Sequence, residues 1–217
     1  MYNQFMFGMN LVVKNENISI GVRPAKLDDV PIISTGLSSF KVNIWTTLTG
    51  APTLEIEKEW YEKMSKSEKD FTWILSPSDS DEAIGVVSLN DIDNIGSCTQ
   101  GLAIWNQKWW GKGVATLANL ACIWFACDQI NRNTIRAYVR SPNTVARKAA
   151  EKIGFTVWGI QPGVFFRDGI YVDTCHLLFV NPNTVNQIFP KGIPIEFQTG
   201  IDKAQKSLEL ARKSVEY

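Results

Sequence analysis

The stretch Trp109-Trp110-Gly111-Lys112-Gly113-Val114-Ala115-Thr116 decides how the rest of this chain is interpreted. It follows a strand-like run from Thr99 to Ile104 and precedes an apolar segment, Leu117 to Ala126, which is typical of a buried helix. Glycine permits a sharp bend, and the first amides of a helix lack internal partners and attract anions. The sequence therefore predicts a strand, a glycine turn and a helix start that suit a phosphate-bearing ligand. A tight turn required only by packing is the alternative, because Gly-x-Gly alone has low specificity.

The size and charge of the chain restrict its class. With 217 residues it can form one well-cored domain with an appendage, and 22 basic residues balance 22 acidic ones. No net field directs it toward nucleic acid or an anionic membrane, so we expect neither partner. No apolar run reaches the about 18–20 residues of a membrane span, and the first ten residues lack the features of a secretory signal. We therefore expect a cytoplasmic protein.

The cysteines and the histidine do not favour a metal site. Cys98, Cys122, Cys127 and Cys175 show no Cys-x-x-Cys spacing, and His176 is the one histidine. Because zinc sites are built from clustered cysteine and histidine ligands, we expect no metal and interpret the four thiols as buried and reduced.

The order of apolar runs and turns predicts a mixed α/β (α+β) domain. An N-terminal hairpin is followed by two helices, the second capped by Thr53, and then by an antiparallel meander of three strands. A strand after the glycine turn and its helix is expected to lie parallel to the strand before them. Asn143 then opens a helix that Gly154 ends. The expected strands are 11–13, 18–22, 71–75, 84–89, 99–104, 134–139, 155–160 and 171–180; the expected helices are 30–40, 54–66, 114–127, 143–153 and 202–215.

This order, together with five segments, resembles the GNAT N-acetyltransferases and, within them, the RimJ/RimL-like branch. The segments are Val22-Arg23-Pro24 with Asp28-Asp29, Ile84 to Leu89 with Asp91 and Asp93, Trp110 to Thr116, Asn143 to Phe155, and Arg167 to Asp173. The resemblance implies a mostly antiparallel central sheet of about six to seven strands, with helices on both faces and a V-shaped splay between the two central parallel strands. The resemblance covers about residues 11–181, and we assign the acetyltransferase domain to residues 1–181. Residues 182–217 form a C-terminal extension, whose helix shows no clean apolar stripe and is expected to pack loosely on the domain or on a second subunit in a homodimer.

The resemblance also implies acetyl-CoA as co-substrate and assigns residues to it. The turn would hold the pyrophosphate through the backbone, with the Thr116 hydroxyl as a further donor. Lys112, Arg147 and Lys148 would meet the ADP phosphates, unless they are solvated surface cations. Asn143 would bind the cofactor arm, or cap its helix, or do both. The turn residues are Trp110, Gly111, Lys112, Gly113, Val114, Ala115 and Thr116; those expected to pair with the pantetheine arm, one of their amides polarising the thioester, are Leu102, Ala103 and Ile104.

The acid and base of the reaction are not where the family places them. Acyl transfer to an amine needs a neutral nucleophile, a proton acceptor and a protonated leaving group. The usual family positions hold Ala146, Ala150 and Trp158, so other groups or positioning must serve. Asp91 is our first candidate, although an ordinary turn carboxylate is the alternative; His176 is a second candidate, with a core histidine as the alternative. The remaining candidates are Asp93, Tyr171 and Asp173.

The sequence thus predicts transfer of an acetyl group from CoA to a primary amine, on a protein N-terminus or a small molecule, by direct attack in a ternary complex. The first two helices, the loop from Phe40 to Pro52 and the closing hairpin would hold the acceptor. Five tryptophans lie in or near these segments and either line the acceptor site or pack in the core and loops: Trp45, Trp105, Trp109, Trp110 and Trp158. Two alternatives stay open. One is an acyl-CoA-binding module of the same fold without turnover, and the other is an unrelated nucleotide-binding protein, which the spacing of Gly111 and Gly113 disfavours.

Overall fold

A computed structural model describes residues 8–48 and 50–217 of the chain, and these form one nine-stranded sheet in the order β7-β8-β6-β5-β4-β3-β2-β1-β9. The first seven residues, part of the segment in which no secretory signal was expected, lie outside the described residues. The strands are β1 (Leu11–Lys14), β2 (Ser19–Pro24), β3 (Phe71–Pro77), β4 (Gly85–Asn90), β5 (Ser97–Ile104), β6 (Thr134–Arg140), β7 (Thr156–Arg167), β8 (Ile170–Val180) and β9 (Val215–Glu216).

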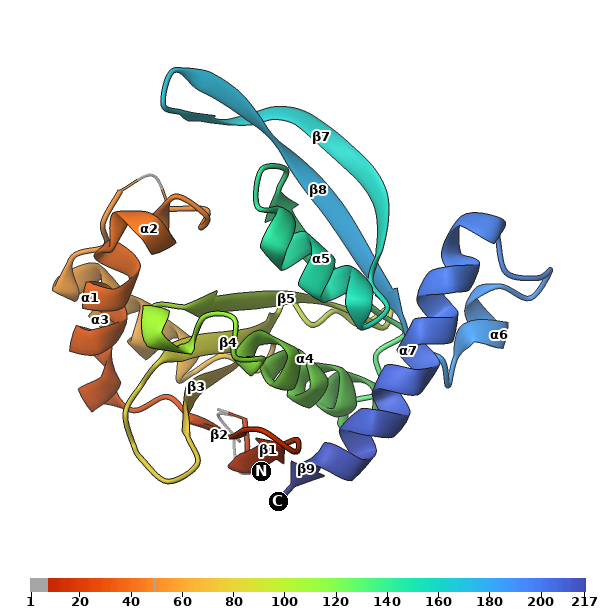
Figure 1. The fold of residues 1–217 in the computed structure, drawn as a ribbon, viewed down its shortest axis with the longest axis horizontal. Helices are drawn as coiled ribbons and strands as arrows, with labels where there is room; N and C mark the ends of the chain where they lie inside the picture. The colour runs from red at the N-terminus through yellow and green to blue at the C-terminus, as the bar shows by residue number, and fades with distance from the viewer. Residues whose placement is uncertain (1–7, 49) are drawn as a thin grey trace.

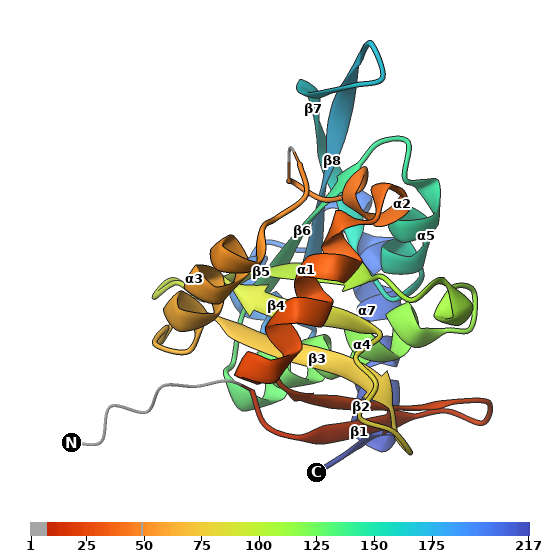
Figure 2. The same cartoon turned by 90° about the vertical axis from the view of Figure 1, so that its left-hand side faces the viewer.

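The pairing of the strands confirms the predicted fold class. β5 and β6 lie parallel, and every other neighbouring pair in the described sheet is antiparallel. The sheet is wider than the six to seven strands expected, because the N-terminal hairpin β1–β2 and the short β9 lengthen one edge. At the other edge, β7 and β8 form a long hairpin that projects from the body of the molecule (Figures 1 and 2).

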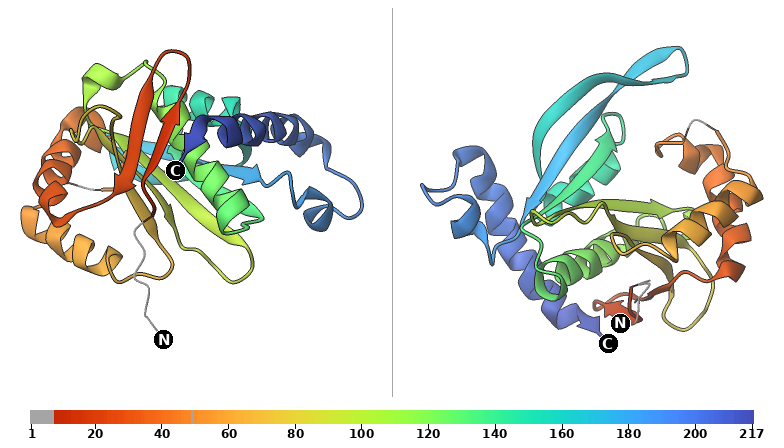
Figure 3. Two further views of the ribbon diagram at one scale, coloured as in Figure 1. Left: turned by 90° about the horizontal axis from the view of Figure 1, so that it is seen from below. Right: turned by 180° about the vertical axis from the view of Figure 1, so that it is seen from behind.

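Helices cover both faces of the sheet (Figures 1 and 3). One group, α1 to α3, lies on one face, and α4, α5 and α7 lie on the other. The helices are α1 (Val30–Ser38), α2 (Phe40–Asn43), α3 (Leu54–Met64), α4 (Val114–Trp124), α5 (Thr144–Lys152), α6 (Val185–Ile188) and α7 (Ile195–Ser214). Short 3-10 turns, η1 (Leu27–Asp29) and η2 (Gln107–Trp109), and a π-helical turn, η3 (Phe125–Gln129), extend or precede them.

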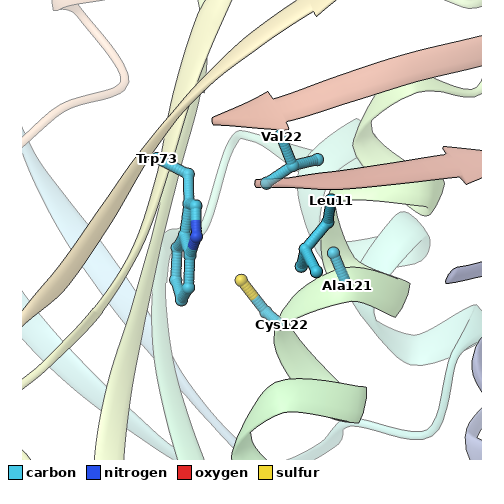
Figure 4. A pocket seen from close by; sticks show the side chains of 5 residues that line it. All are labelled: Leu11, Val22, Trp73, Ala121 and Cys122. Carbon is cyan, nitrogen blue, oxygen red and sulfur yellow. The ribbon is translucent and has the colours of Figure 1, made fainter. Parts of the chain in front are cut away.

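Each face has its own apolar core. Under α4, the ring of Phe125 stands edge-on to Phe71 and Trp73 of β3, with centroids 4.8 and 5.1 Å away. Under α1, a smaller cluster forms around Ile33, Ile74 and Trp105. Figure 4 shows a narrow apolar hollow between β1, β2, β3 and α4, which has no room for a water-sized molecule. We regard this hollow as a packing feature of the core.

Local signals fix the ends of several elements. Thr53 Oγ1 accepts a hydrogen bond from the amide of Ile56 at 3.3 Å, which confirms the predicted cap of α3. The turn between β7 and β8 has positive φ at Asp168 and Gly169, 49° and 80°, as a two-residue hairpin of type I′ requires. The starts of α4 and α5 thus agree with the sequence, whereas β7 extends to Arg167 and does not end at residue 160 as expected.

The C-terminal helix contradicts the expectation of loose packing. The residues Ile201, Ala204, Leu208 and Ala211 of α7 are buried, and the helix contacts α4 and β8. Arg212 Nε donates to Asp128 Oδ2 at 2.7 Å, and β9 continues the chain into a pairing with β1. The stripe was missed because small polar residues of α7, such as Ser207, are also buried.

Two expectations about thiols and membranes can be compared with the described residues. All four cysteines are free and buried, as predicted, and burial raises the pKa of Cys98 to about 12. Within residues 8–48 and 50–217, no helix is both long and apolar enough to cross a membrane, and no group of three metal-ligating side chains occurs.

Candidate active site

The parallel strands β5 and β6 separate about halfway along their length. They pair from Ser97 to Gln100 of β5 and from Thr134 to Ala137 of β6. Beyond that point residues 101–104 pair with β4 alone, and residues 138–140 pair with β8 alone. The sheet therefore has a V-shaped opening, which confirms the predicted splay; Figure 1 shows β5 and the β7–β8 hairpin diverging.

Two residues of β5 turn their backbone groups toward this opening. The amide of Trp105 donates to the Ile84 carbonyl at 3.1 Å, so odd-numbered residues here face β4. Because backbone groups alternate sides along an antiparallel strand, those of Leu102 and Ile104 face the opening. The backbone of Ala103 faces β4, so the structure does not bring this third predicted residue to the opening through its backbone.

Trp110 ties the glycine turn to the end of β5. Its indole Nε1 donates to the Ile104 carbonyl at 2.8 Å. This occupies the carbonyl of Ile104 and leaves the Ile104 amide, together with both backbone groups of Leu102, on the open side. The Leu102 side chain is 36% exposed there. A ligand in the opening can therefore bind β5 as an added strand does.

The turn itself has the backbone of an anion site. Gly111 and Gly113 have φ of 75° and 90°, the left-handed region that L side chains disfavour. A Cβ at Gly111 would meet no atom within 4 Å, and one at Gly113 only the end of Ile18 at 3.8 Å. Backbone conformation rather than close packing thus requires the glycines. Among the described residues, nothing accepts a hydrogen bond from the amides of residues 111–116.

The N-termini of α4 and α5 flank the opening, because α4 follows β5 and α5 follows β6. Lys112 Nζ lies over the ring of Trp109, 5.2 Å from its centroid, and Lys148 is exposed one turn into α5. Arg147 is less available, because its Nε lies 3.9 Å from Glu151. Within the described residues, Lys112 and Lys148 therefore have no ion-pair partner, and they lie near the N-termini of α4 and α5.

Asn143 has the position that the sequence predicted at the start of α5. Its Oδ1 accepts from the amide of Ala146 at 3.1 Å, so the residue caps the helix. In the described part of the chain nothing accepts from its Nδ2, and the residue follows directly on the splayed part of β6. The cap is confirmed, and the amide group remains for a ligand.

Asp91 lies just outside the opening. It follows β4 at the end where Asn90 pairs with Thr99, whereas the opening starts beyond Gln100 and ends at Ile104. About three residues along a strand, or roughly 10 Å, separate it from the start of the opening. The neighbouring Asp93 serves the turn, since its Oδ1 accepts from the amide of Ser97 at 2.7 Å.

A tyrosine and the histidine lie together beside the splayed part of β6. Tyr138 lies on the splayed part of β6 and is paired in register with His176 of β8; their rings meet edge-on with centroids 5.0 Å apart. His176 Nε2 lies 3.1 Å from Gln161 Oε1, and the ring is half-buried rather than in the core. Tyr171 is 74% exposed near the hairpin turn, and Asp173 accepts from the amide of Gly163.

Sequence reasoning missed two arginines on this side of the sheet. Arg140 of β6 donates to the carbonyl of Thr46, and Arg167 of β7 donates to the carbonyl of Leu48. The segment that follows α2 therefore lies against β6 and the closing hairpin. The alternating polar side chains of β6 were the available signal, but their partners lie 94 and 119 residues away in sequence.

The tryptophans do not form one group. Trp105 is buried and donates to the Ala83 carbonyl at 2.9 Å, whereas Trp45 and Trp158 are 41% and 56% exposed. A pocket of about 310 Å³ opens between α1 and Trp105, with Glu82 at its margin. It lies on the face of α1, next to the end of β5.

Comparisons with known proteins agree with this geometry. A family model described as the acetyltransferase (GNAT) domain matches residues 19–156, more than half of the chain. The solved spermidine N-acetyltransferase from Vibrio cholerae in complex with CoA and spermine has a TM-score of 0.72 and 19% identity, over 79% of this chain and 100% of that chain. A chimera of that enzyme, SpeG, with hSSAT gives 0.69 and 20%, over 77% and 98%.

Curated proteins give no significant match to the sequence. Identities near 20% show a shared fold only, whereas the family model covers the sheet from β2 to the start of β7, including the opening and the glycine turn. The splayed strands, the glycine turn and the family match lead to one conclusion: the chain belongs to the GNAT acetyltransferase family.

Proposed function

We propose that the protein transfers the acetyl group of acetyl-CoA to a primary amine. The observation that carries this proposal is the set of free amides at residues 111–116, placed at one end of the opening between β5 and β6. A diphosphate at a helix N-terminus accepts such amides, and Lys112 and Lys148 add positive charge. The pantetheine arm would extend along Leu102 and Ile104, and Asn143 Nδ2 would bind it from the other wall.

The reaction follows from this placement. The amine nitrogen attacks the thioester carbon, the C–S bond breaks after the C–N bond forms, and the thiolate takes up a proton. An open-side amide of Leu102 or Ile104 stabilises the developing oxyanion. We assign His176, together with Tyr138, to the proton that the amine loses, because both lie on the face opposite α4 and beside the splay.

The acceptor class is broader than one compound. Small-molecule amines and protein N-termini both present a primary amine, and the second would agree with the RimJ/RimL-like branch that the sequence resembles. The solved relatives act on spermidine, so polyamines belong to the test. We place the reaction in the cytoplasm, in agreement with four reduced, buried thiols. We keep the division into a GNAT domain, 1–181, and an extension, 182–217, and propose that the extension completes the core rather than binds a second subunit.

One observation favours a second function, an acyl-CoA-binding module without turnover. The positions where relatives of this fold carry acid–base groups hold Ala146, Ala150 and Trp158. Such a module would bind CoA through the same amides and release no thiol.

A thiol-release assay separates the two functions. Acetyl-CoA is mixed with spermidine, spermine, amino acids, their decarboxylated analogues and short peptides, and CoA binding is measured in parallel by calorimetry. The buried cysteines of the protein contribute no background to a thiol reagent. Thiol release with at least one amine supports the transferase, whereas CoA binding without release from any amine supports the module. Absence of CoA binding would overturn both.

A further inference from the structure

Arg140, the last residue of β6, is buried without an acidic partner. Its side chain is 4% exposed, its Nη2 donates to the Thr46 carbonyl, and the ring of Phe165 lies 3.3 Å from its guanidinium carbon. Within residues 8–48 and 50–217, its Nε and Nη1 have neither a hydrogen-bond partner nor solvent contact. A buried charge without a counter-ion is costly, so this arrangement indicates a site for an anion that the chain does not itself supply.

The other arginines with a buried, unpartnered nitrogen differ from it. The side chains of Arg23, Arg136 and Arg147 also have such an Nε. Each of these three lies within 4 Å of a carboxylate, at 2.8 Å, 3.7 Å and 3.9 Å respectively. Among the described residues, no ion pair involves Arg140. Of these four arginines, Arg140 is therefore the one that has no carboxylate partner in the described structure.

Two further polar residues belong to the same region as Arg140. Thr174 of β8 is paired in register with Arg140, and its buried Oγ1 has no partner in the described structure. Arg167 supplies a second cation; burial first, and then the charge of Arg167, lowers the pKa of Arg140. We call Arg140, Arg167 and Thr174 the Arg140 cluster. It combines two cations with a hydroxyl, a combination that binds carboxylates.

The cluster lies on the acceptor side of the opening. Arg140 is two residues beyond Tyr138 on β6 and shares its face of the sheet, while Thr174 is two residues from His176 on β8. This is the face to which the segment after α2 contributes the carbonyls of Thr46 and Leu48. These carbonyls are weaker acceptors than a carboxylate would be at the same guanidinium groups.

We propose that the Arg140 cluster binds a carboxylate of the acceptor, so that the acceptor is an amine that also carries a carboxylate. This inference rests on the proposed amine acetyl transfer. The carboxylate displaces the Thr46 carbonyl, accepts from the free nitrogens of Arg140 in the planar geometry that arginine favours, and accepts from Thr174 Oγ1. The same two cations repel a polyamine, whose charges are all positive.

Matched amines test the proposal. We would compare 6-aminohexanoate with hexylamine, tyrosine with tyramine and lysine with cadaverine, and add spermidine. We expect at least one carboxylated member to exceed its partner about tenfold in kcat/KM. In Arg140→Gln the KM of that carboxylated member rises about tenfold or more, and its kcat/KM advantage over the partner amine is lost. Arg136→Gln, which removes a guanidinium that already has a carboxylate partner, leaves the ratio unchanged.

Binding measurements separate this proposal from the proposed function. N-acetyltyrosine and N-acetyltyramine are titrated into the protein with CoA present, which requires no turnover. Tighter binding of the carboxylated product, lost in Arg140→Gln and partly restored in Arg140→Lys, supports the cluster even if no amine is acetylated. Equal binding of the two products, or a spermidine kcat/KM above that of every carboxylated amine, overturns it. Thermal unfolding and CoA affinity of Arg140→Gln confirm that the variant is folded.

Discussion

The indole of Trp110 donates a hydrogen bond to the main-chain carbonyl of Ile104 at 2.8 Å. This bond fixes the glycine turn to the end of the splayed strand, so that the amides of the turn and the backbone of Leu102 keep one relative position. A net hydrogen bond is worth about 0.5–1.5 kcal/mol.

We therefore expect Trp110→Phe, which keeps an aromatic ring but removes the donor, to weaken CoA binding by roughly threefold to tenfold. Isothermal titration calorimetry with CoA measures the effect. Trp158→Phe is the matched control, because Trp158 lies on β7 and is 56% exposed. An unchanged dissociation constant for Trp110→Phe would show that the bond does not position the turn.

Gly113 begins α4 with φ of 90°, and a side chain there meets only the end of Ile18. Forcing alanine into this left-handed conformation costs roughly 1–2 kcal/mol. Gly113→Ala should lower the free energy of unfolding by up to that amount and shift the amides of the turn as the alanine leaves this conformation, so we expect CoA affinity to fall about tenfold. Gly159→Ala, at a glycine with ordinary φ and open space around it, should leave both quantities unchanged. Retained affinity in Gly113→Ala would separate the turn from CoA binding.

Leu208 and Leu210 test the packing of the C-terminal helix. Leu208 is fully buried between α7 and the sheet, whereas Leu210 is 50% exposed. Leu208→Ala should lower the free energy of unfolding by about 2–5 kcal/mol through the cavity it leaves. Leu210→Ala should change it by less than about 0.5 kcal/mol. Urea denaturation at equal protein concentration gives both values, and similar small effects would mean that the helix is an appendage.

The pair Arg23–Asp29 gives a pH dependence of stability. Burial alone would raise the pKa of Asp29, but the hydrogen bonds from Arg23 and from the Lys26 amide outweigh it and hold the pKa below its usual range. A carboxyl whose pKa is lower in the folded state stabilises the fold above its unfolded pKa of about 3.9, and this contribution is lost as the pH falls through the folded value.

Asp29→Asn should therefore be less stable than the parent at pH 7, and the difference should shrink below about pH 4. Denaturant unfolding at several pH values between these limits measures it. Asp28→Asn is the matched control, because Asp28 is exposed and adjacent in sequence. A stability difference for Asp29→Asn that does not depend on pH would contradict the assignment.

The thiols provide a prediction about reactivity. Burial raises the pKa of all three core cysteines Cys98, Cys122 and Cys127, so little thiolate is present at neutral pH. A thiol reagent should modify none of the four cysteines in the native protein within the time of an assay, and all four after denaturation. Rapid modification of one native thiol would show that the region around it opens.

The sequence predicted those features that depend on local chemistry. Thr53 and Asn143 cap helices because their side chains reach amides three residues away, and Gly113 begins α4 because its φ excludes most other residues. Each of these signals lies within a few residues of the element that it controls. The V-shaped splay was implied by the resemblance to the GNAT family.

Features that depend on contacts between residues far apart in the sequence could not be predicted from local signals. The stripe of α7 includes Gly200 and Ser207, which look polar or flexible in sequence but are buried where the helix approaches the domain closely. The position of Asp91, just outside the opening, follows from the strand register and not from the residues around it. The environment of Arg140 includes the Thr46 carbonyl, which lies 94 residues earlier in the chain.

The central claim is that the free amides of residues 111–116 hold a diphosphate and direct a thioester into the opening between β5 and β6. A crystal structure with CoA tests it most directly. The account predicts the diphosphate against these amides, the pantetheine arm along Leu102 and Ile104, and the sulfur near the point where Gln100 and Ala137 cease to pair. CoA bound elsewhere, or an opening filled by side chains at saturating CoA, would contradict it.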